Sequence, residues 1–125
     1  MSERQAIEVL IEHYFTFLQT GDADMIEHLF LPECDLISPA RDGTVTHMDL
    51  ATYENIVRSR PSPRSMGYER FGRLLLVDQT GETMALAKVS CAVQPKYFTD
   101  YLTLVKKDGD WKIAAKVFVL ERIEA

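Results

Sequence analysis

The first part of the chain carries apolar residues at the spacing of an amphipathic helix. Ser2 and Gln5 form a capping box, which predicts a helix start at the N-terminus. The apolar positions that follow recur every three or four residues: Ile7, Leu10, Ile11, Tyr14, Phe15 and Leu18. Gly21 is the residue type expected just after a helix end. We therefore predict a long first helix with one wide apolar stripe.

A second, shorter helix and a first strand are predicted next. Asp22 is an expected N-cap for a helix from Ala23 to about Phe30, which Pro32 would end. The segment Cys34–Ala40 has the composition of a strand. Arg41–Thr44 follows it with the residues of a hairpin turn. These signals place a strand directly after the two helices.

A third helix is predicted in the middle of the chain. Thr46 and Asp49 have the spacing of a second capping box. The helix would run to about Arg60, because Pro61 and Pro63 cannot continue it.

From Tyr68 onward the apolar positions alternate with a period of two, which is typical of strands. Gly81, Pro95 and the Asp108-Gly109 pair stand at the expected turns. Four strands are predicted: Tyr68–Asp78, Thr83–Gln94, Phe98–Lys107 and Trp111–Arg122. Helices followed by an antiparallel meander indicate an α+β fold, with the helices on one face of the sheet.

The Asp108-Gly109 turn also predicts which side chains share a face of the sheet. A two-residue turn pairs Lys107 with Asp110. The inner pairs are then Leu104 with Ile113, Leu102 with Ala115, Asp100 with Val117 and Phe98 with Val119. A turn at Pro95-Lys96 adds Ala85, Ala87, Val89, Cys91 and Val93 to this face. The opposite face carries Thr99, Tyr101, Thr103, Lys112 and Lys116.

Length and composition restrict the class of protein. The 125 residues are 46% hydrophobic and 26% charged, which excludes a disordered chain and predicts one domain over residues 1–125. A net charge of -5 without a basic stripe argues against a nucleic-acid partner. The start has no signal-peptide pattern and no stretch is long enough to span a membrane, so we expect a cytoplasmic protein without a membrane partner.

The cysteines and histidines predict neither a metal site nor a cofactor. Cys34 and Cys91 match no metal or redox spacing, and we expect them to be reduced and buried. The three histidines, His13, His28 and His47, form no metal signature. His47, at the predicted start of the third helix, is interpreted as a surface residue or a base.

Asp100 is the main candidate for chemistry, because it is the one carboxylate among apolar neighbours on the predicted inner face. Such a group must find a partner or keep its proton, and a carboxyl group that keeps its proton in a pocket suits acid–base work or hydrogen-bond donation. A structural alternative pairs Asp100 with Arg70, whose facing depends on the length of the turn near Gly81. Tyr14 would lie in the helical stripe, as a core residue or a polar anchor. The facing of Asp35 stays open.

A basic segment runs from Arg58 to Arg73. It holds five arginines and a single glutamate, within a chain that is acidic overall. Arginine forks match carboxylates and phosphates, so the segment is either an anion site or a solvated surface that pairs with nearby acids.

The segment FTDYLTLVKKDGDWKI at residues 98–113, followed by Lys116-Val117-Phe118, resembles the closing hairpin of the nuclear transport factor 2-like superfamily. The resemblance covers nearly the whole chain and is greatest to the putative lumazine-binding and polyketide cyclase-like branch. It implies a cone-shaped, curved antiparallel sheet against three N-terminal helices, as in a cystatin-like roll, with a pocket at the open end. It also implies frequent homodimers through the outer sheet face.

The superfamily includes ketosteroid isomerase, scytalone dehydratase, limonene epoxide hydrolase and polyketide cyclases, besides modules without activity. Tyr14, Asp35 and Asp100 fall in regions similar to those that hold the tyrosine, the base and the second aspartate of the isomerase. The histidines of the dehydratase type have no clear equivalents here.

The first functional hypothesis is a protein that binds a small hydrophobic or mixed-polarity ligand. The predicted pocket residues are Tyr14, Phe15, Leu18, Tyr53, Cys91, Asp100, Leu102 and Val117. An enzyme of the isomerase, dehydratase or cyclase type would use Asp35 or Asp100 as base and Tyr14 to stabilise an enolate oxygen. The second hypothesis is a homodimeric module without activity, joined through Thr99, Tyr101, Thr103, Ala114 and Phe118.

Overall fold

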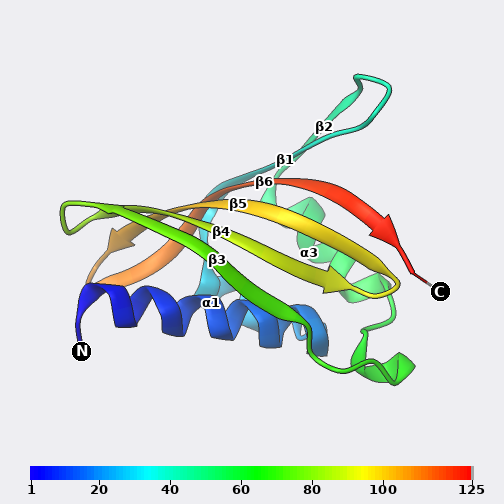
Figure 1. The fold of residues 1–125 in the computed structure, drawn as a ribbon, viewed down its shortest axis with the longest axis horizontal. Helices are drawn as coiled ribbons and strands as arrows, with labels where there is room; N and C mark the ends of the chain where they lie inside the picture. The colour runs from blue at the N-terminus through cyan, green and yellow to red at the C-terminus, as the bar shows by residue number, and fades with distance from the viewer. Residues whose placement is uncertain (125) are drawn as a thin grey trace.

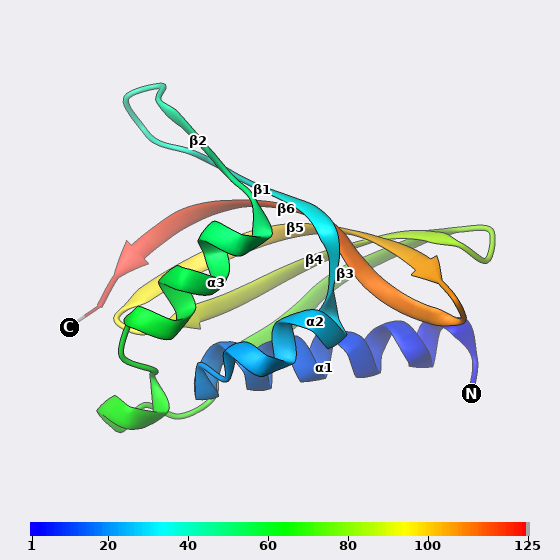
Figure 2. The ribbon, with the colours of Figure 1, turned by 180° about the vertical axis from the view of Figure 1, so that it is seen from behind.

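The computed structural model describes residues 1–124 as a curved, open sheet with helices against its concave face (Figures 1 and 2). The helical elements are α1 (Glu3–Thr20), η1 (Ala23–Met25), α2 (Ile26–Leu29), α3 (Leu50–Ser59) and η2 (Arg64–Met66). The strands are β1 (Phe30–Pro39), β2 (Val45–Met48), β3 (Gly72–Thr80), β4 (Met84–Val93), β5 (Lys96–Lys107) and β6 (Asp110–Ile123). The predicted α+β class and the three helices are confirmed.

The sheet has the strand order β2-β1-β6-β5-β4-β3. β1 and β6 run parallel, and the other neighbouring strands pair antiparallel. The apolar stripe of α1 packs on the inner face, so the core lies between this helix and the middle of the sheet. No helix within residues 1–124 has the length and apolar character needed to cross a membrane.

The first helix forms as predicted. The Ser2 hydroxyl accepts a hydrogen bond from the Gln5 backbone at 3.1 Å, and the Gln5 side chain accepts one from the Ser2 backbone at 2.9 Å. Gly21 ends the helix in the left-handed conformation with a φ of 66°, which glycine adopts without strain.

Two predicted boundaries are wrong because strand pairing replaces a local helix signal. The second helix ends at Leu29, since Phe30 is already extended and pairs with Ile113 of β6. Pro32 therefore lies within β1, at an irregular part of the pairing where its missing N–H is tolerated. Thr46 does not cap α3; it belongs to β2, and Asp49 alone is the N-cap.

The most consequential difference is a β-bulge in β6. Leu104 pairs with Ile113 as predicted, but the next pair joins Thr103 to Ala115. One extra residue, Ala114, is therefore accommodated on β6, and the side chains from Ala115 to Leu120 change face, up to a second shift before Arg122.

The bulge reverses the predicted facing of the second half of β6. Lys116, predicted on the outer face, is 5% exposed and faces inward. Val117, predicted in the pocket, is 40% exposed on the outer face, and Val119 is likewise exposed. Phe118 moves inward and its ring packs on Phe98 at 5.9 Å between centroids.

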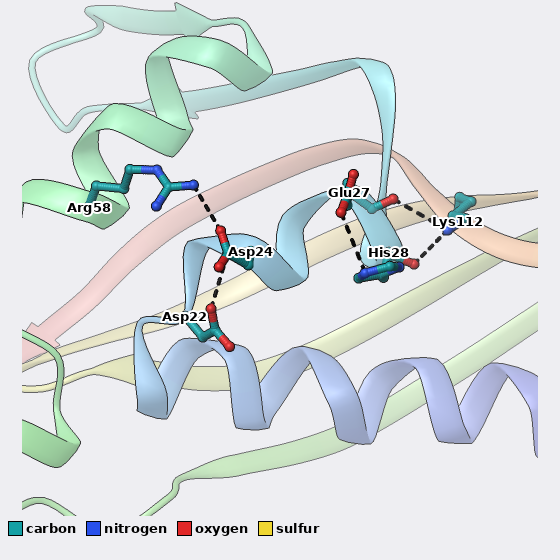
Figure 3. A network of polar contacts seen from close by, with 6 residues as sticks. All are labelled: Asp22, Asp24, Glu27, His28, Arg58 and Lys112. Carbon is teal, nitrogen blue, oxygen red and sulfur yellow. Dashed lines mark hydrogen bonds and ion pairs between the residues drawn. The ribbon is translucent and has the colours of Figure 1, made fainter.

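Polar contacts hold the short α2 region between α3 and the sheet (Figure 3). Arg58 of α3 donates to the Asp24 carboxylate at 3.1 Å. Lys112 of β6 donates to the carbonyl oxygen of His28 at 2.7 Å, at the end of α2 where a cation is favourable. These contacts fix the elements on either side of the space that α1, α3 and the sheet enclose.

Candidate functional site

A cavity of about 230 Å³ lies between α1, α3 and the inner face of β4, β5 and β6. Aromatic and aliphatic side chains form most of its wall. The lining residues are Tyr14, Leu18, Met48, Tyr53, Ile56, Arg60, Cys91, Val93, Lys96, Phe98, Asp100, Lys116 and Phe118. Residues near the end of α3 and at the start of β5 also line it, and these two segments lie at the same end of the sheet (Figure 2).

Asp100 lies on the inner face of β5, as the alternation of this strand predicted, and is 1% exposed. Its Oδ2 atom accepts a hydrogen bond from the Tyr14 hydroxyl at 2.5 Å and another from the Cys91 thiol at 3.1 Å. Short O–H···O⁻ distances are typical of hydrogen bonds to an ionised acceptor. Donors from α1 and β4 thus converge on one carboxylate oxygen of β5.

Lys116 is the cation of this site. Its Nζ lies 3.9 Å from Asp100 Oδ2 and 3.4 Å from the Tyr53 hydroxyl oxygen. The ammonium group is also 4.8 Å from the ring centroids of both Tyr53 and Phe118, within the range of cation–π attraction. Burial alone would lower the pKa of Lys116, but the groups around it, with Tyr53 first and Asp100 next, raise that pKa above its ordinary value.

The sequence pattern did not indicate Lys116, because strict alternation places it on the outer face. The bulge at Ala114 brings it inward. The available signal was chemical: a buried carboxylate requires a compensating donor or cation. Arg70, the partner that the sequence suggests for Asp100, instead forms an ion pair with Glu12 and lies over the Phe15 ring at 5.5 Å.

The second oxygen of Asp100 is not hydrogen-bonded. Oδ1 is buried, and no donor among residues 1–124 reaches it. An unpaired buried acceptor costs about 1–3 kcal/mol, more when it is charged. Asp100 lines the cavity, and a ligand N–H or O–H group that reached Oδ1 would supply the missing hydrogen bond.

The Tyr14 hydroxyl uses its proton in the hydrogen bond to Asp100. Burial, with the adjacent Asp100 charge, raises the pKa of the Tyr14 phenol well above its ordinary value, and does the same to the Cys91 thiol. Both groups therefore stay protonated at neutral pH and both donate to Oδ2. The predicted role of Tyr14, donation to an enolate oxygen, would require breaking its bond to Asp100. Lys116 has the N–H groups that remain free for that role.

Several predicted pocket residues lie elsewhere. Tyr14, Leu18, Tyr53, Cys91 and Asp100 line the cavity, whereas Phe15 and Leu102 are buried in the core outside it. The Phe15 ring packs so closely on Gly72 that a Cβ added at this position would clash with it. Val117 is on the outer face because of the bulge.

Asp35 also lies outside the cavity lining. Its side chain is 61% exposed and its Oδ1 lies 3.0 Å from His47 Nε2. His47 belongs to β2, not to the start of a helix, and is equally exposed. The pair joins neighbouring strands at the edge of the sheet.

The two cysteines are free and buried, as predicted. Burial raises the pKa of the Cys34 thiol to about 12. No cluster of three or more His, Cys, Asp or Glu side chains suited to a metal occurs within residues 1–124.

Comparison with known proteins identifies the fold. A family model described as putative lumazine-binding matches residues 2–119. The chain is similar to an NTF2-like protein of unknown function from Shewanella baltica OS155, with 19% identity, a TM-score of 0.84 and coverage of 96% of this chain and 94% of that chain. It is also similar to an NTF-2 like protein of unknown function from Silicibacter pomeroyi DSS-3, with 19% identity, a TM-score of 0.78 and coverage of 97% and 100%.

A further similar structure is titled as a putative scytalone dehydratase, from Novosphingobium aromaticivorans DSM 12444. It is 19% identical with a TM-score of 0.64, and the match covers 98% of this chain and 86% of that chain. No curated protein matches the chain. At these identities the structures share the fold, and the chemistry must be argued from the site.

The raised pKa of Tyr14 predicts a loss of stability in alkali. An unfolded tyrosine loses its proton near about pH 10, whereas native Tyr14 keeps it, so the free energy of unfolding falls as pH rises above about 10, by up to about 1.4 kcal/mol per pH unit. The raised pKa of Lys116 acts in the same direction. Urea unfolding from about pH 9 to 11 should therefore show a shallower decline for Tyr14→Phe than for wild type.

Tyr101→Phe is the matched control, because Tyr101 is 50% exposed on the outer face. It should keep the wild-type decline. Equal slopes for Tyr14→Phe and wild type would contradict a raised pKa of the buried Tyr14 phenol.

Proposed function

The chain belongs to the putative lumazine-binding family of the nuclear transport factor 2-like superfamily, and we propose that it binds a small organic molecule in the cavity beside Asp100. The observation that supports this most directly is the buried, unpaired Oδ1 of Asp100, a residue that lines a cavity with mostly apolar walls. A convergent polar group in an apolar pocket is the usual form of a small-molecule site.

The cavity volume indicates the size of the ligand. At about 230 Å³ it exceeds a cavity of roughly 150 Å³, which accommodates benzene, and is smaller than the roughly 300 Å³ at which pockets for drug-sized compounds begin. A compound of one or two rings fits this range. The rings of Tyr14, Tyr53, Phe98 and Phe118 supply faces for such a compound to contact.

The polar groups indicate which atoms the ligand presents. Asp100 Oδ1 accepts, so the ligand places an N–H or O–H there. The Lys116 ammonium donates, so a ligand oxygen or ring nitrogen lies beside it. A lactam, an imide or an enolised ketone carries both kinds of atom close together.

Proton transfer is a second candidate function, favoured by the same free oxygen. Asp100 Oδ1 would take a proton from the carbon next to a carbonyl, and the electron pair of that C–H bond would form the enolate. Lys116 would hold the enolate oxygen in place of Tyr14, whose hydroxyl donates its hydrogen bond to Asp100 Oδ2. Return of the proton to another carbon completes an isomerisation, within the isomerase, dehydratase or cyclase class.

Homodimerisation through the outer sheet face is a separate proposal, compatible with ligand binding. Four large apolar side chains are exposed there around a shallow groove: Leu75, Tyr101, Val117 and Val119. A second copy of the chain would cover this face. Phe118, also predicted in this interface, borders the groove, but its ring packs on Phe98 at the cavity.

Ligand binding predicts a difference between two aspartate variants. One- and two-ring lactams and phenols, with lumazine included because the family description names it, should shift amide NMR resonances of cavity residues. Asp100→Asn should weaken this binding about tenfold, because a neutral amide replaces the charged acceptor. Asp35→Asn, the same change outside the cavity, should leave the affinity unchanged. A panel in which no compound shifts cavity resonances would contradict the proposal.

Proton transfer predicts exchange of substrate protons with solvent. Small hydrophobic enones incubated with the protein in D₂O should exchange their α-protons, followed by ¹H NMR. Asp100→Asn should slow the exchange by about a hundredfold or more, the usual contribution of a general base. Asp35→Asn is again the control. Wild-type exchange that survives in Asp100→Asn would exclude Asp100 as the base.

Dimerisation predicts that a charge on the outer face separates the copies. Wild-type protein at high micromolar concentration should sediment as a dimer, and Tyr101→Lys as a monomer. Met66→Lys places the same charge at an exposed apolar residue of η2 and should stay dimeric. A monomeric wild type would rule out the interface.

A further inference from the structure

The cavity contains more positive than negative charge. Four charged side chains line it: the carboxylate of Asp100 and the cations Arg60, Lys96 and Lys116. The single carboxylate balances Lys116, which lies 3.9 Å away. Arg60 and Lys96 therefore remain as an excess of two positive charges. This contrasts with the whole chain, whose net charge is -5.

Arg60 is held at the cavity by the end of α3. It is the C-cap residue and takes an extended conformation, with φ of -89° and ψ of 148°, because Pro61 follows it. Its guanidinium lies over the ring of Tyr53 at 5.9 Å, and Tyr53 is a wall of the cavity. Lys96 is the first residue of β5 and also lines the cavity.

These two cations differ from other basic residues near them. Arg58 pairs with both Asp24 and Glu54, and Arg70 pairs with Glu12. Within residues 1–124, by contrast, no carboxylate lies within ion-pair distance of Arg60 or Lys96. Within the basic segment, Arg58 and Arg70 thus form ion pairs on the surface, whereas Arg60 lines the cavity.

A cleft with one sign of charge and low-dielectric walls concentrates ions of the other sign. Arginine binds carboxylates through two parallel hydrogen bonds, and a nearby lysine adds a second charge. The cavity volume of about 230 Å³ favours a compact carboxylate over anything as large as a nucleotide.

We propose that the ligand of this cavity is a small aromatic or alicyclic carboxylate with a hydroxyl or N–H at its far end. This inference rests on the proposed function and specifies its ligand class. The carboxylate contacts Arg60 and Lys96, the ring packs between Tyr53 and Phe118, and the far donor reaches Asp100 Oδ1. Lys116 neutralises Asp100, so the two negative groups do not repel each other strongly.

Three probe compounds test the contributions of the carboxylate end and the hydroxyl end of the ligand separately. These are 4-hydroxyphenylacetate, its neutral amide 4-hydroxyphenylacetamide, and phenylacetate, which lacks the hydroxyl. Binding is measured by NMR titration of the full chain at low and high salt. Wild type should bind the hydroxy acid about tenfold more tightly than its amide, and added salt should reduce only the affinity of the acids. Phenylacetate should bind more weakly than the hydroxy acid, because it offers Asp100 no donor.

Charge-removing variants test the two cations directly. Arg60→Gln and Lys96→Gln should each lower the preference for the acid over the amide by about threefold or more, with little effect on the amide itself. Arg64→Gln is the matched control, because Arg64 lies in η2 outside the cavity lining, and it should keep the wild-type preference.

The outcomes distinguish this inference from the proposed function. Equal affinities of wild type for the acid and the amide, both shifting cavity resonances, would overturn the carboxylate assignment and leave small-molecule binding standing. Loss of the preference in Arg64→Gln as well would show a general surface effect and would also overturn the assignment. A wild type that binds neither these probes nor the lactam and phenol panel would contradict both proposals.

Discussion

The structure depends on keeping one carboxylate away from water. Asp100 is almost completely buried, and an ionised group in that position is tolerated only with donors and a countercharge around it. Tyr14, Cys91 and Lys116 supply them from three different elements. Replacing such a group with an apolar residue is often neutral or stabilising, so its presence is better explained by binding or chemistry than by stability.

The arrangement around Asp100 is asymmetric, and this asymmetry gives the cavity its chemical character. Oδ2 is shared by two donors, whereas Oδ1 is unpaired. The donors also hold their protons more tightly than usual, since burial raises the pKa of both Tyr14 and Cys91. The free acceptor is therefore on Asp100 and the free donor is on Lys116. The fold, which this chain shares with proteins of unknown function, does not determine that distribution; the local side chains do.

Local signals and alternation were sufficient for much of the fold and part of the site. The Ser2 capping box and Gly21 correctly predicted where α1 begins and ends. The free N–H and C=O groups at a helix end find their hydrogen-bond partners within a few residues, so a local sequence signal is sufficient there. Alternation along β5 placed Asp100 inward, and the helical stripe placed Tyr14 toward the same core. Local helix signals failed where strand pairing competed for the same residues, with the distant β6 at Phe30 and with the neighbouring β1 at Thr46.

The sequence by itself thus determined the α+β class, the first helix and a buried aspartate facing a tyrosine-bearing helix. Only the tertiary structure decided which cation meets Asp100. One extra residue at Ala114 turns Lys116 inward and Val117 outward, and nothing local to the strand marks that residue as a bulge. Strand register is set by the sum of contacts along a whole sheet, so a single inserted residue changes every facing beyond it. Arg70, the cation that sequence suggested, pairs instead with Glu12 on α1, a partner that only the folded chain brings near.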